Sequence, residues 1–389
     1  MGRPGRHEHR ASHGRNSSFP KMLNETPRGD VVLVTGGCGF LGKHLVKLVA
    51  ERGENVAEIR VLDIQQKPDD LNLGFDGKMA GIELKYFQGD IRNKGKIQEA
   101  FTGVNAVIHC ASIIDTGNLP DHEVMDSINV KGTSNVLESC IEQGVEYLIY
   151  TGTSELGRSW DPILGADEDD VDQSQTRDDL ILNGYARTKS KAEREALAAN
   201  GTILHNGKTM KTISLRPCGI YGEGDSKYIT VIMKIGKSVG ILPILGSAEV
   251  KMQRVYVGNV AWAHVCTLNT IRKEENISGT SYIITDDSPV CNNFLWAKPF
   301  LEAHKVKLLN IEIPLLFLYF FWSIIEWFTI LISPVLKIRM PSSKNELVMA
   351  CTTCYYNGDK ARRQLKYKPL YSAQHCYQRA YEYYTNLEL

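Results

Sequence analysis

Short apolar runs alternate with helical patterns through the first two thirds of the chain. The apolar runs have the length of buried strands, and most are followed by a longer stretch in which apolar residues recur every three or four positions. This repeated order is typical of parallel strands joined by helices. We therefore predict an α/β fold with a doubly wound, Rossmann-like parallel sheet, with strands at 31–35, 59–63, 83–87, 106–111, 146–151 and 212–216.

The first predicted strand runs into a glycine-rich turn, G-x-x-G-x-x-G, and an amphipathic helix follows. Gly36 lets the chain turn tightly, and Gly39 leaves room for a pyrophosphate. Gly42 lets the helix lie close against the sheet. Phe40 and Leu41 stand at the positive end of that helix, which attracts phosphate. This turn predicts a dinucleotide-binding site.

Acidic residues follow the next two strands. Asp63 closes the second strand, about 20 residues after the last glycine, where a carboxylate accepts hydrogen bonds from the adenosine ribose. A carboxylate there repels a 2′-phosphate, which favours NAD, although the nearby Lys67 leaves NADP as the alternative. Asp90 and Ile91 end the third strand region and are predicted to border the adenine.

A tyrosine and a lysine at i and i+4 form the candidate catalytic pair. Tyr185 and Lys189 fall on one face of a predicted helix, and Thr153 follows the fifth strand. Because a free phenol has a pKa near 10, we expect Lys189 and the cationic nicotinamide to lower the pKa of Tyr185. Tyr185 then takes the substrate hydroxyl proton, Thr153 hydrogen-bonds the substrate oxygen, and Lys189 also holds the nicotinamide ribose.

Further segments strengthen this interpretation, namely residues 129–136, 215–225, 255–264, 282–289 and 360–372. With the glycine turn and the Tyr-Lys pair, they resemble the extended short-chain dehydrogenases, and more narrowly the 3β-hydroxysteroid dehydrogenase/Δ5-isomerase family. The resemblance covers the chain from about residue 31 onward. It implies NAD-dependent oxidation of a 3β-hydroxyl on a steroid or sterol, with or without a later Δ5 to Δ4 isomerisation, for which the sequence identifies no base.

Two departures from the family pattern concern the substrate. The usual Thr-Ser-Ser after the fifth strand is Thr151-Gly152-Thr153, so Thr153 becomes the hydroxyl donor, with Ser154 as the substitute. The prolines that usually flank the catalytic tyrosine are absent. A sterol-4α-carboxylate 3-dehydrogenase would use the same residues and is the alternative function. A catalytically inactive NAD-binding interaction protein is another, and nucleotide-sugar epimerases or dehydratases share the fold.

Residues 314–333 form one long apolar run with a single charge, Glu326. A helix of about 20 residues covers roughly 30 Å of hydrocarbon, but a carboxylate makes a full crossing costly. Residues 359–372 resemble the segment that packs back onto the catalytic domain in this family, and so must share its side of the membrane. We therefore expect a monotopic or re-entrant helix that contacts lipid and walls the sterol entrance. A full span and a buried core helix are the alternatives.

Composition adds limits. Lys plus Arg and Asp plus Glu are balanced at 45 each, so no nucleic-acid partner is predicted. Nine scattered cysteines suggest a reducing compartment, and the Cys351/Cys354 pair lacks further ligands, so we predict no metal site and assign this stretch to a strand. The acidic stretch 166–172 is predicted to be a solvated loop, and His109 a core residue.

The chain is expected to divide into three parts: a disordered tail (1–30), an NAD-binding catalytic domain (31–225) and a substrate-binding part (226–389). The tail has almost no aliphatic residues to bury. The resemblance further suggests a membrane-associated enzyme at the endoplasmic reticulum, with a mitochondrial membrane as the alternative. The catalytic domain is expected to face the cytosol, and a homodimer is compatible with these features.

Overall fold

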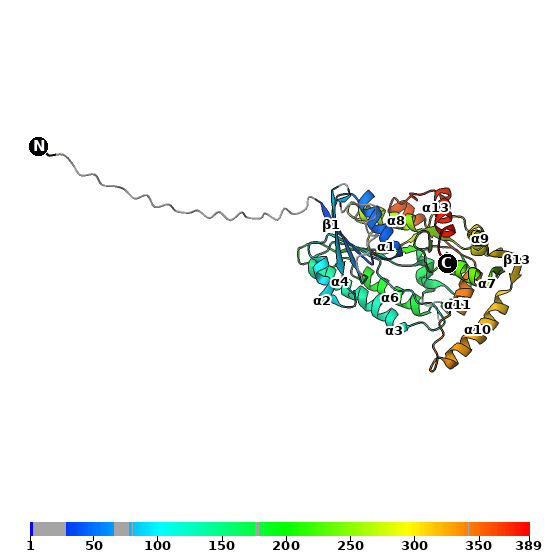
Figure 1. Ribbon diagram of the computed structural model, residues 1–389. Coiled ribbons are helices and arrows are strands. Elements are labelled where there is room, and N and C mark those ends of the chain that lie inside the picture. Colours follow the sequence, from blue (N-terminus) through cyan, green and yellow to red (C-terminus); the bar gives the residue numbers. More distant parts are fainter. Residues whose placement is uncertain are drawn as a thin grey trace.

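Figure 1 shows the computed structural model of the chain. The structure describes residues 1–2, 29–65, 78–79, 81–175, 177, 179–181, 183–340 and 342–389. Most of the predicted tail (1–30) lies outside these residues, as does Lys67, so both interpretations stay predictions.

An eight-stranded sheet forms the centre of the fold, in the order β12-β8-β6-β5-β1-β2-β4-β3. All neighbouring strands are parallel except β3 and β4. The six predicted strands are all present and the predicted fold class is confirmed, while the two edge strands, β12 and β3, were not predicted. The strands are β1 (Asp30–Thr35), β2 (Val56–Asp63), β3 (Lys78–Met79), β4 (Ile82–Gln88), β5 (Ala106–His109), β6 (Tyr147–Thr151), β8 (Lys211–Pro217) and β12 (Thr280–Ile284).

Both faces of the sheet are buried, which explains the continuous apolar runs. Alternate residues of β1 enter different cores: Val32 and Val34 pack on one side, and Val31 and Leu33 on the other. Helices α1 (Phe40–Arg52) and α8 (Val257–Ile271) contact one another on the first face. The second face is covered by α2 (Lys94–Phe101), α4 (Gly132–Gln143) and α6 (Asn183–Ala198). Helix α3 (His122–Met125) and a π-helical turn (Asp126–Lys131) precede α4.

Three small parallel pairs of strands lie beyond the main sheet: β10 (Ile241–Leu245) with β13 (Lys307–Ile313), β9 (Gly219–Tyr221) with β11 (Arg254–Tyr256), and β7 (Ile163–Ala166) with β14 (Cys354–Tyr356). Other elements are a 3-10 turn (Ser154–Gly157), α5 (Glu168–Ser174), α7 (Ile229–Val239), α9 (Asn293–Ala303), α11 (Lys344–Cys351), α12 (Asp359–Gln364) and α13 (Ala373–Thr385). Although α8 and β12 follow residue 225, they return to the main sheet.

Two local predictions are wrong: a predicted loop and part of a predicted strand are helical, and each helix begins with a capping box. The acidic stretch 166–172 contains the start of α5, where Asp167 and Asp170 form a capping box. Glu168 is buried, and its carboxylate accepts the Ile283 N–H at 2.6 Å. The residues before Cys351 are helical in α11, which starts with a second capping box. The strand begins only at Cys354.

All nine cysteines are free, and the reducing compartment stays a prediction. Two other local predictions are confirmed. His109 is buried between two hydroxyls, with Nδ1 2.6 Å from Thr35 Oγ1 and Nε2 2.9 Å from Thr133 Oγ1. Burial lowers the pKa of His109 to about 3, so the imidazole is neutral. The C-terminal segment packs back onto the domain: α12 contacts β12, and the Trp262 indole N–H donates to Lys368 O at 2.9 Å.

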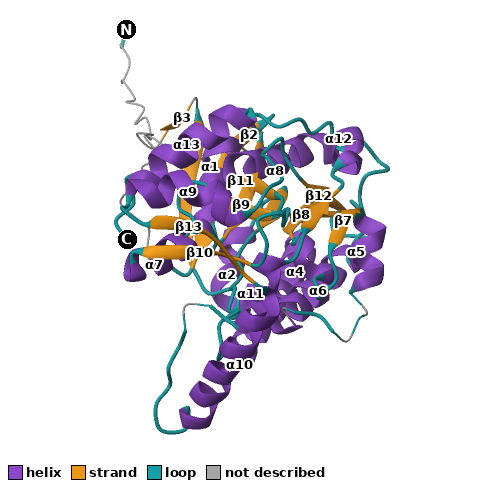
Figure 2. Cartoon of the chain, turned by 90° about the vertical axis from the view of Figure 1, so that its right-hand side faces the viewer, coloured by secondary structure: helices purple, strands orange, loops and turns teal. Residues whose placement is uncertain are grey.

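Helix α10 (Leu315–Ile332) is different from the other helices because it extends from the body of the protein, and the following coil returns beside it (Figure 2). Only 11% of its residues are buried, which excludes the alternative of a core helix. It is the one helix among the described residues long and apolar enough to cross a membrane, and one such helix is weak evidence by itself. Its exposed apolar residues are Leu316, Phe317, Phe320, Phe321, Ile324, Ile325, Trp327, Phe328, Ile330 and Leu331.

Candidate active site

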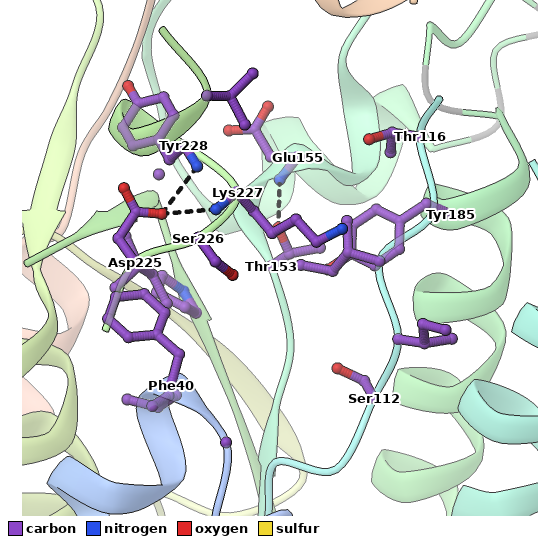
Figure 3. Close-up of a pocket in the computed structure, with 18 of the residues that line it drawn as sticks. Phe40, Ser112, Thr116, Thr153, Glu155, Tyr185, Asp225, Ser226, Lys227 and Tyr228 are labelled. Carbon is purple, nitrogen blue, oxygen red and sulfur yellow. Dashed lines mark hydrogen bonds between the residues drawn. The ribbon is translucent and has the colours of Figure 1, made fainter. Parts of the chain in front are cut away.

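One cavity of about 850 Å³ lies along the carboxyl ends of the central strands and continues to α7, α10 and α11. This is where doubly wound sheets bind their ligands. Every residue predicted for the site lines it, and Figure 3 shows part of the lining. These residues are Gly36, Gly39, Phe40, Leu41, Gly42, Asp63, Asp90, Ile91, Thr153, Tyr185 and Lys189. The fold therefore brings them together, while their individual roles stay predictions.

The glycine turn packs too closely for side chains. Gly36 has a φ of +69°, and a Cβ there would lie 2.7 Å from the Ala111 Cα. A Cβ on Gly42 would overlap the carbonyl oxygen of Gly36, so glycine allows the close approach of helix and turn. Gly39 is the N-cap of α1 and provides no side-chain cap, so the first N–H groups of the helix remain available to an anion at this end of the cavity.

Asp63 lies at the rim of the same turn and is 7% exposed. Its Oδ2 accepts the Cys38 N–H at 2.9 Å, and its Oδ1 accepts the Gln65 N–H at 3.0 Å. These bonds orient a carboxylate whose remaining lone pairs are available to hydroxyl groups. Asp90 pairs with Arg92, whose hydrogen bonds lower the pKa of this carboxyl group. The glycine turn and the two acidic residues thus suit a nucleotide that carries ribose hydroxyls and a pyrophosphate.

The catalytic candidates come from β6 and α6. Lys189 is 3% exposed; its Nζ donates to Thr151 O at 2.7 Å and lies 4.4 Å from the centre of the Tyr150 ring. Thr153 follows β6, and its Oγ1 accepts the Glu155 N–H at 3.2 Å. Ser154, the substitute donor, is fully buried and does not line the cavity, so Thr153 is the better candidate.

The expected acidification of Tyr185 is not found in the protein alone. Burial raises the pKa of Tyr185, and the nearby Glu155 carboxylate adds to that effect, while the Thr153 hydroxyl opposes it. Burial also lowers the pKa of Lys189 to about 8. The prediction underestimated desolvation: the free energy lost when the phenolate is removed from water exceeds the stabilisation that its polar neighbours provide.

Sequence reasoning missed Glu155. One of its oxygens lies 3.2 Å from Arg158 Nε, but this buried oxygen accepts no hydrogen bond from the part of the chain that the structure describes. Burial raises the pKa of Glu155, so the group is suited to carry a proton. Its signal in the sequence was an acidic residue four positions after the end of the fifth predicted strand and two positions beyond Thr153.

The far part of the cavity is apolar. Its wall comes from three helices and one strand, and comprises Val231, Ile232, Ile235, Leu242, Leu245, Leu318, Trp322, Leu347, Met349 and Ala350. Lys227 also lines the cavity, and its side chain extends across it in Figure 3. Among the described residues no carboxylate pairs with Lys227, and no cluster of His, Cys, Asp and Glu is placed to hold a metal ion.

Comparison with known proteins gives one family and many solved folds. A model of the 3-beta hydroxysteroid dehydrogenase/isomerase family matches residues 33–315. A dTDP-glucose 4,6-dehydratase from Streptomyces venezuelae, solved with NAD bound, is 21% identical with a TM-score of 0.66, covering 92% of this chain and 97% of its own. The UDP-glucose 4-epimerase of Thermus thermophilus, in complex with NAD, is 19% identical with a TM-score of 0.61, covering 92% and 100%. At these identities the likeness shows the fold.

Proposed function

The chain belongs to the 3-beta hydroxysteroid dehydrogenase/isomerase family, and on that premise we propose that it oxidises the 3β-hydroxyl of a steroid or sterol to the 3-ketone, with NAD as the hydride acceptor. One observation carries the proposal: the nucleotide-binding turn, the Thr153/Tyr185/Lys189 group and a long apolar compartment share a single cavity. A hydride acceptor and a rigid apolar alcohol would meet where the two compartments join.

The polar compartment supports NAD. The uncapped start of α1 would hold the pyrophosphate, and Asp63 would accept hydrogen bonds from the adenosine ribose. Asp90 and Ile91 would border the adenine, and Lys189 would hold the nicotinamide ribose. NAD supplies a positively charged ring that accepts hydride.

The protein's own residues handle the proton. Thr153 would hydrogen-bond the substrate oxygen and orient it toward Tyr185, whose Oη would accept the hydroxyl proton as the carbon loses hydride. In the protein without NAD, burial raises the pKa of Tyr185, so the phenol keeps its own proton. Its deprotonation before the reaction therefore needs an added positive charge nearby in the same water-excluded space. The cationic nicotinamide meets that need, and the coupling would restrict base catalysis to the loaded enzyme.

Glu155 supports a second step, the Δ5 to Δ4 isomerisation. This step moves a proton from C4 to C6 of the 3-ketone, and one carboxyl group can remove it and return it. Glu155 lines the cavity beside Thr153, and its raised pKa suits both half-steps.

Lys227 favours one alternative, a sterol-4α-carboxylate 3-dehydrogenase. Its side chain extends into the cavity toward Tyr185, and its ammonium group would attract a carboxylate next to the reacting carbon. A preference for 4-carboxysterols that is lost in Lys227→Gln would support this alternative. Lys237→Gln is the matched control, because Lys237 is an exposed residue of α7 outside the cavity lining.

Helix α10 supports attachment to the lipid surface, with the endoplasmic reticulum as the proposed membrane and the catalytic domain on the cytosolic side. Its exposed apolar residues suit the boundary between lipid headgroups and acyl chains. Lys337 and Arg339 lie on the returning coil, a few residues after the end of the helix. Cations at that position belong with headgroups, which favours a helix lying in the plane of the interface over one that crosses. A protease-protected C-terminus beyond residue 345, with an accessible catalytic domain, would instead show a crossing.

The function is tested by offering NAD and three substrate classes to the purified full-length protein: 3β-hydroxy-5-ene steroids, 4-carboxysterols and bile-acid precursors. We expect NADH with at least one class, and about a thousandfold slower formation by Tyr185→Phe with retained NAD binding. Absence of NADH with every class, together with conversion of a UDP-sugar, would overturn the proposal. NAD binding without any turnover would instead favour the inactive interaction protein.

A further inference from the structure

The loop between β5 and α3 forms one wall of the cavity. Six of its residues line the cavity: Cys110, Ala111, Ser112, Ile113, Ile114 and Thr116. Figure 3 shows Ser112 and Thr116 on the side opposite Phe40 and Asp225. The position of this loop therefore sets the width of the cavity next to the reacting carbon.

Asn118, further along this loop, binds the elements that form the outer wall. Its Nδ2 donates to Thr329 Oγ1 on α10 and to Ile338 O on the returning coil, both at 3.0 Å. Its Oδ1 accepts the Met340 N–H at 2.9 Å. Asn118 is 8% exposed and Thr329 is 5% exposed, so water competes poorly for these bonds. One side chain thus joins the catalytic domain to α10 and to the returning coil, which together form the α10 hairpin (residues 315–340).

A second bond supports the same connection. The Thr116 hydroxyl donates to the carboxylate of Glu346, in the first turn of α11. The loop is therefore bonded to the last turn of α10, to the returning coil and to the first turn of α11. Helix α10 also packs against α11, where Glu326 accepts the Lys344 N–H at 2.5 Å, and its Trp322 indole N–H donates to Ser342 O at 3.3 Å. The bonds of Asn118 add its connection to the loop between β5 and α3.

We propose that Asn118 is a positioning residue that holds the loop and the α10 hairpin together around the apolar compartment, a proposal that rests on the function given above. With these bonds made, Leu318 and Trp322 of α10 stay against the cavity and keep water from the bound lipid. With the bonds broken, the two walls separate and the lipid is held less well. The glycine turn meets this loop at Ala111, seven residues before Asn118, and we expect the nucleotide compartment to be unaffected.

The test compares Asn118→Ala with the wild-type full chain, using a 3β-hydroxysteroid dissolved in phosphatidylcholine vesicles. We expect the KM for the steroid to rise about fivefold or more, with kcat and the KM for NAD within about twofold. Thr329→Val removes one acceptor and should give a smaller rise. Asn200→Ala is the matched control, since Asn200 Oδ1 accepts the Thr212 N–H at 3.0 Å at the opposite end of the sheet.

Amide hydrogen exchange gives a second measurement that does not depend on turnover. Asn118→Ala should speed exchange in residues 113–121 and 338–340 without changing exchange in the glycine turn. An unchanged steroid KM in the active variant, or a parallel rise in both KM values, would overturn the positioning role. If no steroid is oxidised by the wild type, the proposed function fails, and unchanged exchange in these two segments would separately reject the connection.

Discussion

The two ends of the cavity are built in opposite ways. At the sheet edge the polar groups are buried and oriented by short hydrogen bonds, as in Asp63 and Lys189. At the other end α10 exposes a continuous apolar face and is held by a few contacts. Soluble monomers rarely expose apolar patches of this kind. The comparison separates a rigid part of the cavity, where the proposed reaction takes place, from an exposed part that is suited to contact lipid.

The largest effect should come from the fixed end. Tyr185→Phe removes the proton acceptor, so turnover should fall about a thousandfold while NAD affinity, measured by fluorescence titration, stays within about twofold. Tyr367→Phe is the matched control: its buried hydroxyl has no hydrogen-bond partner among the described residues and lies outside the cavity lining, so activity should be retained. Comparable activity in both variants would show that the base is wrongly assigned.

Glu155→Gln separates two steps within the same end. The amide cannot shuttle a proton, so isomerisation of a Δ5-3-ketone should slow about a hundredfold while oxidation changes less than about threefold. Conversion is followed by the absorbance of the conjugated ketone. Equal loss in both steps would mean that Glu155 positions the substrate and does not carry the proton.

Lys189→Met tests whether burying the Lys189 ammonium in the catalytic part of the cavity lowers the stability of the folded protein. The pKa of Lys189 is about 8 in the folded protein and 10.5 unfolded, so the unfolded chain binds more protons between these values. Wild-type stability should therefore rise from pH 8 to pH 10.5, and the cost of the buried ammonium is fully present below pH 8.

In Lys189→Met, stability should no longer rise between pH 8 and pH 10.5, and the free energy of unfolding at pH 7 should be about 2 kcal/mol higher than in the wild type. Turnover should be at least tenfold slower. Denaturant unfolding at pH 7 and pH 10 measures the first two effects. A variant that is less stable than the wild type and keeps the wild-type pH dependence would contradict an unfavourable buried ammonium at Lys189.

The smallest effect on folding should come from the exposed end. Replacing Phe320 and Ile324 by Ser alters side chains that are 60% and 49% exposed, so unfolding should change by less than about 0.5 kcal/mol. The membrane-bound fraction after carbonate extraction should nevertheless fall clearly. Leu164→Ser, at an exposed apolar residue of β7, should leave it unchanged. Equal loss in both proteins would show that α10 has no special role in attachment.

Much of the fold and site followed from local pattern. Gly36, Gly39 and Gly42 act through backbone geometry within one turn, and Tyr185 and Lys189 share a helix face by spacing alone. The strands were predictable because burial on both faces leaves continuous apolar runs. Glu168 was misread because a buried carboxylate satisfied by the Ile283 N–H has the same sequence signature as a solvated one.

The sequence by itself determined the nucleotide-binding turn, the catalytic helix and the long apolar segment, since each depends on residues close together in the chain. Only the tertiary structure decided how these parts meet. It placed Glu155 in the cavity, raised the pKa of Tyr185 by burial, and joined Asn118 to Thr329 and Met340. Desolvation and long-range hydrogen bonds depend on residues far apart in sequence, and no local pattern records them.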